Sequence, residues 1–123
     1  MVAKTEQQKT LVVVMGGTID AFYNPENGTP HTVPVPDSPE KSCIPEALKK
    51  LGLADGCEVW PFCMKDSKKI IQADLDAIAK RVREEGYSKV IVVHGTDTMP
   101  NSGLYLQEAL KNTEARVVIT GSM

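Results

Sequence analysis

Two glycine-rich segments, each following an apolar run, carry the side chains that are best suited to take part in a chemical reaction. Residues 16–20 read GGTID and residues 94–99 read HGTDTM. Thr18 supplies a hydroxyl in the first segment, and Thr96 and Asp97 supply a hydroxyl and a carboxylate in the second. Glycine lets the backbone approach a ligand closely, so N–H groups become available as donors. A nucleophile, a carboxylate and N–H donors fit acyl transfer better than redox or phosphoryl chemistry.

Each of these residues also has a purely structural interpretation. Thr18 is a residue type that forms turns after a glycine pair. Thr96, Asp97 and Thr98 are types that cap the N-terminus of a following helix. His94 ends a predicted buried strand, where a hydrogen-bonded structural histidine is the expected role.

Composition narrows the function classes. The 123 residues carry a formal net charge of −2 and are 41% hydrophobic, which is typical of a globular domain and gives no general reason to bind nucleic acid or an anionic membrane. Neither G-x-G-x-x-G nor a Walker lysine motif is present, so nucleotide binding has little support. The three cysteines form no C-x-x-C pair, and we expect reduced thiols and no metal site.

The N-terminal region shows neither a secretory signal nor a membrane span. Residues 11–15 form the longest apolar run, far shorter than the roughly 20 residues that cross a bilayer. The first ten residues lack an apolar core of the secretory type. We therefore expect a cytoplasmic protein whose residues 1–10 fray.

Apolar runs and helical periodicity alternate along the chain. Strands are expected where β-branched residues cluster, and helices where apolar residues recur every three or four positions. The pattern predicts strands at 11–15, 57–64, 89–93 and 115–120, and helices at 43–51, 72–85 and 100–111. This alternation predicts an α/β fold: a parallel, flavodoxin-like or Rossmann-like sheet with helices on both faces.

Right-handed crossovers favour the strand order 2-1-3-4 in such a sheet. The winding then reverses between the first and third strands, and ligands bind beyond the carboxyl ends at such a reversal. Segments 16–20 and 94–99 would face each other across one crevice. One helix would cover one face and two the other, so we expect an exposed apolar patch, and hence a homo-oligomer or a fragment whose continuation covers it.

A long segment separates the first strand from the first helix. Residues 20–41 hold five of the eight prolines, and long loops of this kind in compact domains often serve as lids. We expect a lid that carries Tyr23. The whole chain, residues 1–123, is expected to form one domain.

Together the motifs resemble the L-asparaginase family of bacterial and archaeal type. The resemblance rests on GGTI after the first strand, DS after the second, HGTDTM after the third and TGSM after the fourth. HGTDTM is a highly specific match, and the resemblance covers the chain from Leu11 to Met123. The short YNPENG turn and the KDS segment look closest to short, single-domain asparaginase-like proteins, with this chain matching the N-terminal domain of the larger enzymes.

The resemblance implies three catalytic residues. Thr18 matches the nucleophile that attacks the side-chain amide carbon, and a threonine hydroxyl needs a neighbour to activate it. Tyr23 matches the flap tyrosine that helps this activation, and His31 lies within the same loop. Thr96 matches the second threonine, which helps to place water, and N–H groups around it donate to the oxyanion.

The resemblance also implies a site for a small amino-acid substrate. Ser67 matches the residue that holds the substrate α-carboxylate, and Asp97 matches the carboxylate that pairs with the α-ammonium. Gly17, Asp66 and Gly95 complete the expected substrate-binding set. The implied reaction is hydrolysis of the side-chain amide of L-asparagine, or a related amide, through an acyl-threonine intermediate, and it needs no metal or organic cofactor.

Two other functions stay open. The family's lysine that pairs with the second threonine lies after the segment matched by TGSM, so no residue here occupies its position, and Lys68 and Lys69 change the charge beside Ser67. These departures favour a catalytically weak or inactive module for amino-acid binding or assembly. The other function is that of an asparaginase-like amidotransferase component that delivers ammonia to a charged tRNA; the lack of a basic face argues against it.

Overall fold

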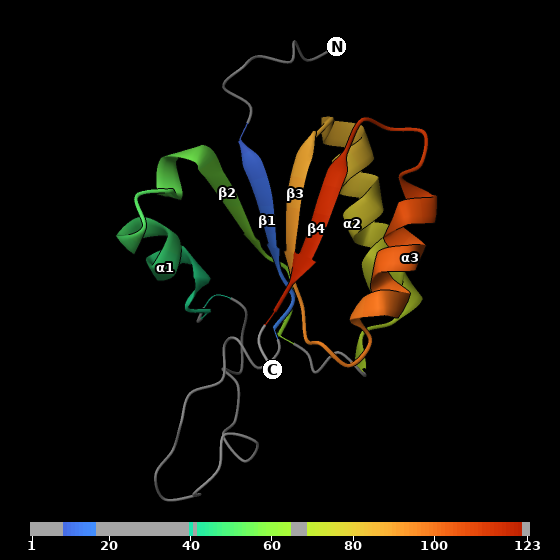
Figure 1. Ribbon diagram of the computed structural model, residues 1–123, viewed down its shortest axis with the longest axis horizontal. Coiled ribbons are helices and arrows are strands. Elements are labelled where there is room, and N and C mark those ends of the chain that lie inside the picture. Colours follow the sequence, from blue (N-terminus) through green and yellow to red (C-terminus); the bar gives the residue numbers. More distant parts are fainter. Residues whose placement is uncertain (1–8, 17–39, 41, 65–68, 122–123) are drawn as a thin grey trace, which may run out of the picture.

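Four parallel strands in the order β2-β1-β3-β4 form the centre of the protein (Figure 1). The computed structural model describes residues 9–16, 40, 42–64 and 69–121. The strands are β1 Thr10–Val14, β2 Cys57–Pro61, β3 Lys89–Val93 and β4 Arg116–Thr120; the helices are α1 Ile44–Lys50, α2 Gln72–Glu85 and α3 Met99–Ala109, with a 3-10 turn at Ala54–Gly56. The predicted α/β fold and strand order are confirmed.

The strand β1 is buried from Leu11 onward because its residues there are apolar on both faces. The side chains of β1 from Leu11 to Val14 are all buried, as expected for a strand between two helical layers. Val14 pairs with Val93 of β3 on one side and with Pro61 of β2 on the other. This register brings the carboxyl ends of the three strands to one edge of the sheet.

The second strand ends earlier than the predicted 57–64. Proline contributes no N–H to a ladder, so regular pairing is difficult to continue past Pro61. The N–H groups of Phe62 and Cys63 both donate to the carbonyl oxygen of Val14, at 3.0 and 3.1 Å. Two donors on one acceptor end the regular ladder at that point.

Glycines follow the first two helices, as the sequence predicts. In α2 the apolar residues Leu75, Ile78, Ala79 and Val82 are buried. Gly86 follows with φ 71° and donates its N–H to the Val82 carbonyl, which is the left-handed C-terminal cap that glycine allows without strain. Helix α1 ends at Lys50 with Leu51 as its C-terminal cap, and Gly52 follows with φ 74°.

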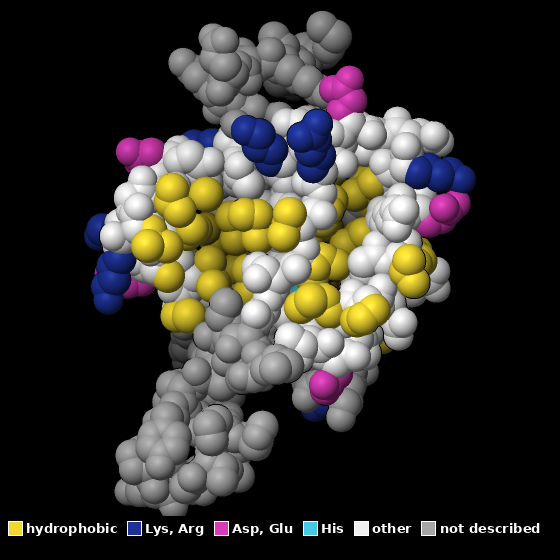
Figure 2. All heavy atoms as spheres, in the orientation of Figure 1, with side chains coloured by type: hydrophobic (Ala, Val, Ile, Leu, Met, Phe, Trp, Pro, Cys, Tyr) yellow, Lys and Arg dark blue, Asp and Glu magenta, His cyan; other side chains and the backbone are white. Residues whose placement is uncertain are grey.

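Helices α2 and α3 lie on one face of the sheet and α1 lies on the other (Figure 1). The larger core joins the sheet to α2 and α3, and a smaller cluster around Val12, Val14 and Ile44 joins it to α1. Beyond that cluster Val118 of β4 is 59% exposed. Figure 2 shows hydrophobic side chains over the strands between α1 and α3, so the expected thinly covered face is present over β4.

An ion pair, a cation–π contact and a hydrogen bond connect β2 to the C-terminal part of α2 and to Tyr87 after it. The guanidinium of Arg81 contacts Glu58 at 2.7 Å and lies 4.6 Å from the ring centroid of Trp60. The hydroxyl of Tyr87 donates to the other oxygen of Glu58, at 2.7 Å. Burial, and then the hydrogen bond to the Glu58 carboxylate, raise the pKa of Tyr87 to about 12.

Candidate active site

The end of β1 lies beside the end of β3. The N–H of Met15 donates to the carbonyl of Val93 at 2.9 Å, which extends the pairing one residue past β1. Gly16 comes next and is buried, with φ 99°, a conformation that favours glycine. The chain therefore turns away from β1 next to the start of the HGTDTM segment, as the strand order predicts.

The end of β2 joins the same edge of the sheet. Besides the backbone bonds of Phe62 and Cys63 to Val14, the Sγ of Cys63 lies 3.5 Å from the Met15 carbonyl oxygen. The chain that leads to Asp66 and Ser67 therefore leaves the sheet next to β1. This edge is where a doubly wound sheet binds its ligand.

The HGTDTM segment becomes more exposed as it runs from β3 to α3. Gly95 is buried, Thr96 is half-buried and Asp97 is exposed. The carbonyl of Thr96 accepts the N–H of Met99 at 3.3 Å. Thr98 occupies the N-cap position of α3, one of the three positions that the sequence offered for the cap, and its side chain makes no capping hydrogen bond. Thr96 and Asp97 precede the cap position.

His94 is fully buried and hydrogen-bonded through both ring nitrogens. Its Nδ1 bonds to the carbonyl oxygen of Gly95, and its Nε2 lies 2.9 Å from the hydroxyl of Ser102 on α3. The prediction of a structural histidine with satisfied hydrogen bonds is confirmed. The partner Ser102 was not predicted, because the contact depends on how α3 packs over the end of β3.

Gly121 brings the end of β4 against the backbone of His94. The N–H of His94 donates to the carbonyl of Thr120 at 2.9 Å. A Cβ atom on Gly121 would lie 2.0 Å from the carbonyl oxygen of His94, far inside the contact distance. This close approach requires glycine at position 121, a requirement that the sequence reasoning did not identify.

Only part of the expected site falls in the described chain. Gly95, Thr96 and Asp97 are described, and they lie together at the carboxyl edge of the sheet. The remaining expected site residues lie outside the described residues: Gly17, Thr18, Tyr23, Asp66 and Ser67. Their assignments stay predictions, and the strand ends that lead to two of these segments lie side by side.

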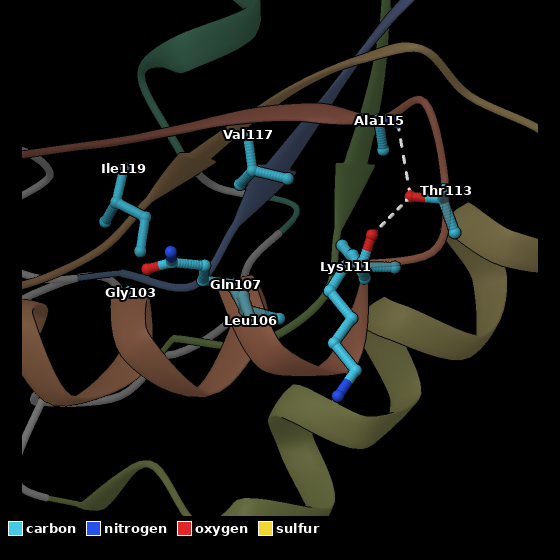
Figure 3. A pocket seen from close by; sticks show the side chains of 9 residues that line it. Gly103, Leu106, Gln107, Lys111, Thr113, Ala115, Val117 and Ile119 are labelled. Atoms are coloured by element: carbon cyan, nitrogen blue, oxygen red, sulfur yellow. Dashed lines mark hydrogen bonds between the residues drawn. The ribbon is translucent and has the colours of Figure 1, made fainter.

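A separate cavity of about 400 Å³ lies between α3 and β4 (Figure 3). Leu106 of α3 lies on one side of it and Val117 and Ile119 of β4 lie on the other, and the polar residues Gln107, Lys111 and Thr113 also line it. It includes none of the expected site residues.

In the described ranges, no cluster of three or more histidine, cysteine or carboxylate side chains could hold a metal ion. Among the same residues, no helix has the length and hydropathy to cross a bilayer.

The fold and the site define an α/β domain with glycine- and hydroxyl-rich loops at the carboxyl edge of a parallel sheet. The chain matches the family described as "Asparaginase, N-terminal" over residues 9–123. It therefore belongs to the asparaginase family and represents the N-terminal domain of that family.

The chain is similar to parts of three longer proteins. The chain is 28% identical, over 117 residues, to one of the subunits of the glutamyl-tRNA(Gln) amidotransferase of Aeropyrum pernix, covering 94% of this chain and 27% of that protein. L-asparaginase I of Vibrio cholerae superposes with a TM-score of 0.62 at 22% identity, over 94% of this chain and 34% of that one. The probable cytoplasmic L-asparaginase of Campylobacter jejuni gives 0.61 at 19% identity, over 93% and 34%. The chain thus spans about a third or less of each relative.

Proposed function

We propose that this domain carries the nucleophile loop and the amino-acid-binding loop of an amidohydrolase that acts on L-asparagine or a related side-chain amide. The observation that supports the proposal is the pairing of Val14 with Val93. This pairing puts the strand end that leads to Thr18 next to the strand end that leads to Thr96 and Asp97. Family membership gives these loops their proposed roles.

In the proposed reaction the Thr18 oxygen attacks the amide carbon while its proton passes to a neighbouring base. The flap residue Tyr23 is the proposed partner in this activation. The C–N bond then breaks, the nitrogen takes up a proton, and ammonia leaves an acyl-threonine ester. Water placed with the help of Thr96 hydrolyses the ester, which regenerates the hydroxyl and releases aspartate. Overall, one asparagine and one water give one aspartate and one ammonia.

The remaining assigned residues hold the substrate. The carboxylate of Asp97 pairs with the α-ammonium, and Ser67 holds the α-carboxylate. Backbone N–H groups near Gly17 and Gly95 donate to the substrate and to the tetrahedral oxyanion, where one well-placed donor changes the rate by ~10²–10³. Asp66 completes the binding set. The proposed chemistry uses no metal and no organic cofactor.

The test is ammonia release from L-asparagine by the 123-residue chain, by Thr18→Ala and by Thr10→Ala. Thr10 begins β1 at the amino edge of the sheet, so its variant is a matched control for the loss of a threonine hydroxyl. We expect release from the parent chain and from Thr10→Ala, and background release from Thr18→Ala. Background rates from all three proteins would contradict the amidohydrolase function and favour a module for amino-acid binding or assembly. Calorimetry with aspartate would then show whether the domain still binds an amino acid.

Three further properties belong to this proposal. Residues 1–123 form one domain in which residues 20–41 act as a lid; the expected fraying of residues 1–10 is wrong for Thr10, which lies in β1 and pairs with Cys57 of β2. The proposed location is the cytoplasm, and the similar protein from Campylobacter jejuni is named as a probable cytoplasmic enzyme. It assembles with copies of itself through the thinly covered face over β4.

A second candidate function is favoured by the relative from Aeropyrum pernix, which is named as part of an amidotransferase. In this case the same loops would release ammonia for transfer to a glutamyl group on tRNA instead of into solution. An assay with asparagine, in the presence and absence of amidotransferase partner proteins and charged tRNA, separates the two functions. Release that requires the partners would favour the amidotransferase role.

A further inference from the structure

His94 and Ser102 are the two polar side chains that are buried in the described part of the chain. The imidazole of His94 has no exposed surface, and a buried polar group is costly unless its hydrogen bonds are satisfied. Both of its nitrogens have partners, and one partner belongs to the loop that carries Thr96 and Asp97. The ring therefore connects this loop to α3.

The partners determine where the ring carries its proton. The carbonyl oxygen of Gly95 only accepts hydrogen bonds, so Nδ1 of His94 must be the donor in that bond. Nε2 is then free to accept the hydroxyl proton of Ser102, at 2.9 Å. The arrangement fits an imidazole protonated on Nδ1, and Ser102 holds the ring in the orientation that this bond requires.

The bond to Gly95 also sets the direction of the next N–H group. The Gly95 carbonyl and the Thr96 N–H belong to one planar peptide, and no peptide bond in the described residues is cis. In a trans peptide the C=O and N–H point in opposite directions. Because the carbonyl points at the buried ring, the N–H of Thr96 points away from it. Within the described ranges this N–H has no acceptor.

The backbone of His94 is held independently of its ring. Its N–H donates to Thr120, and its carbonyl packs against Gly121. Since the residue that anchors the loop is fixed by β4, rotation of the Gly95–Thr96 peptide is the remaining freedom, and the imidazole restrains it. We propose that His94 is a positioning residue that keeps the N–H of Thr96 aimed out of the core as a donor for the substrate's reacting oxygen.

This role rests on the proposed amidohydrolase function, but its first test does not. Long-range ¹H–¹⁵N correlation spectra of the imidazole in the 123-residue chain report which ring nitrogen carries a proton. A proton on Nδ1 of His94, with or without one on Nε2, supports the proposal. A bare Nδ1 overturns it, because the ring would then have no donor for the Gly95 carbonyl.

The second test uses two substitutions that each keep one half of the ring's contacts. The side-chain NH₂ of His94→Asn is in reach of the Gly95 carbonyl, like Nδ1, whereas the amide of His94→Gln is in reach of Ser102, like Nε2. Both lose one buried hydrogen bond, so thermal unfolding followed by circular dichroism should show comparable losses of stability. We expect kcat for asparagine to fall at least tenfold further in His94→Gln than in His94→Asn, with KM changed less than threefold between them.

Ser102→Ala provides the control for stability alone. It removes a buried hydrogen bond but leaves the donor to Gly95, so we expect a lower melting temperature and a smaller loss of kcat than in His94→Gln. Equal kcat in the Asn and Gln variants at equal folded fraction would overturn the positioning role.

If the parent chain releases no ammonia, the proposed function fails while the positioning role can still be measured. The readout is then the ¹⁵N order parameter of the Thr96 amide, which reports how firmly the N–H direction is fixed. We expect a lower order parameter in His94→Gln than in His94→Asn, because only the Asn variant still restrains the Gly95–Thr96 peptide. Equal order parameters in the two variants would overturn the inference without reference to turnover.

Discussion

Gly121 lies so close to His94 that a methyl group on its α-carbon would meet the His94 carbonyl oxygen at 2.0 Å. Backbone of this kind cannot move aside as a flexible side chain does. The contact joins the end of β4 to the end of β3 at the point where the HGTDTM loop begins. Glycine at 121 is therefore a condition for the geometry of the candidate site.

Gly121→Ala should consequently destabilise the fold. Overpacking against a fixed backbone typically costs 1–3 kcal/mol, and we expect a loss of about 2 kcal/mol in the free energy of unfolding, measured by urea denaturation. The matched control is Gly103→Ala in α3, whose new methyl group would meet the nearest atom, Ile119 Cδ1, at 3.7 Å. Alanine is a better helix former than glycine, so the control should gain about 0.5–1 kcal/mol. Equal effects of the two substitutions would contradict the argument.

Asp97→Asn should weaken aspartate binding. Asparagine keeps the size of the side chain but removes the negative charge that is proposed to pair with the substrate α-ammonium. Because Asp97 is exposed, solvent reduces the strength of the pair, and we expect a loss of affinity of about tenfold by calorimetry. Asp55→Asn is the control, since Asp55 is also exposed but lies just before β2 at the opposite edge of the sheet. Unchanged affinity in Asp97→Asn would refute the assigned role.

The sheet order was predictable from the sequence because its causes are local and repeated. Continuous apolar runs at 11–15 and 89–93 are typical of strands that are buried on both faces. The helices between the strands act as crossover connections, and such connections join parallel strands. Helix 72–85 was predicted with its observed ends, since four apolar residues at helical spacing are followed by a glycine. The end of β2 was predicted too late, because the effect of Pro61 depends on how Val14 shares its carbonyl with two donors.

The contacts of the candidate site were less predictable because they join residues that meet only in the folded protein. The bond from Ser102 to His94 requires α3 to turn back over the strand end, and the contact of Gly121 requires the exact stagger of β3 and β4. Residue types at those positions permit these contacts without demanding them. By contrast, the position of Thr96 and Asp97 at the carboxyl edge follows directly from the order of the strands.

Tyr87 should make stability fall at high pH. Its pKa is raised to about 12 in the folded state from an ordinary value near 10. A group whose pKa is raised on folding stabilises the protein fully below its unfolded pKa, and this contribution is lost as the pH rises through the folded value. Between about pH 10 and pH 12 the parent chain should therefore lose roughly 2 kcal/mol more than Tyr87→Phe, which has no hydroxyl to ionise. Urea denaturation at pH 8 and at pH 11.5 measures this difference, and parallel curves for the two proteins would exclude the effect.

Val118→Lys should disrupt the proposed self-association. Val118 is 59% exposed on the thinly covered face, and a lysine there would have to lose its hydration to enter an apolar interface. The control is Leu104→Lys, which replaces an apolar residue that is 67% exposed on α3 on the opposite side of the sheet. Light scattering across a micromolar concentration series should show an oligomer for the parent chain and for Leu104→Lys, with association at least tenfold weaker for Val118→Lys. A monomeric parent chain that binds no hydrophobic dye would instead mean that the apolar surface over β4 is too small to drive association on its own, because such a patch must bury enough area to exceed the entropy lost when two copies join.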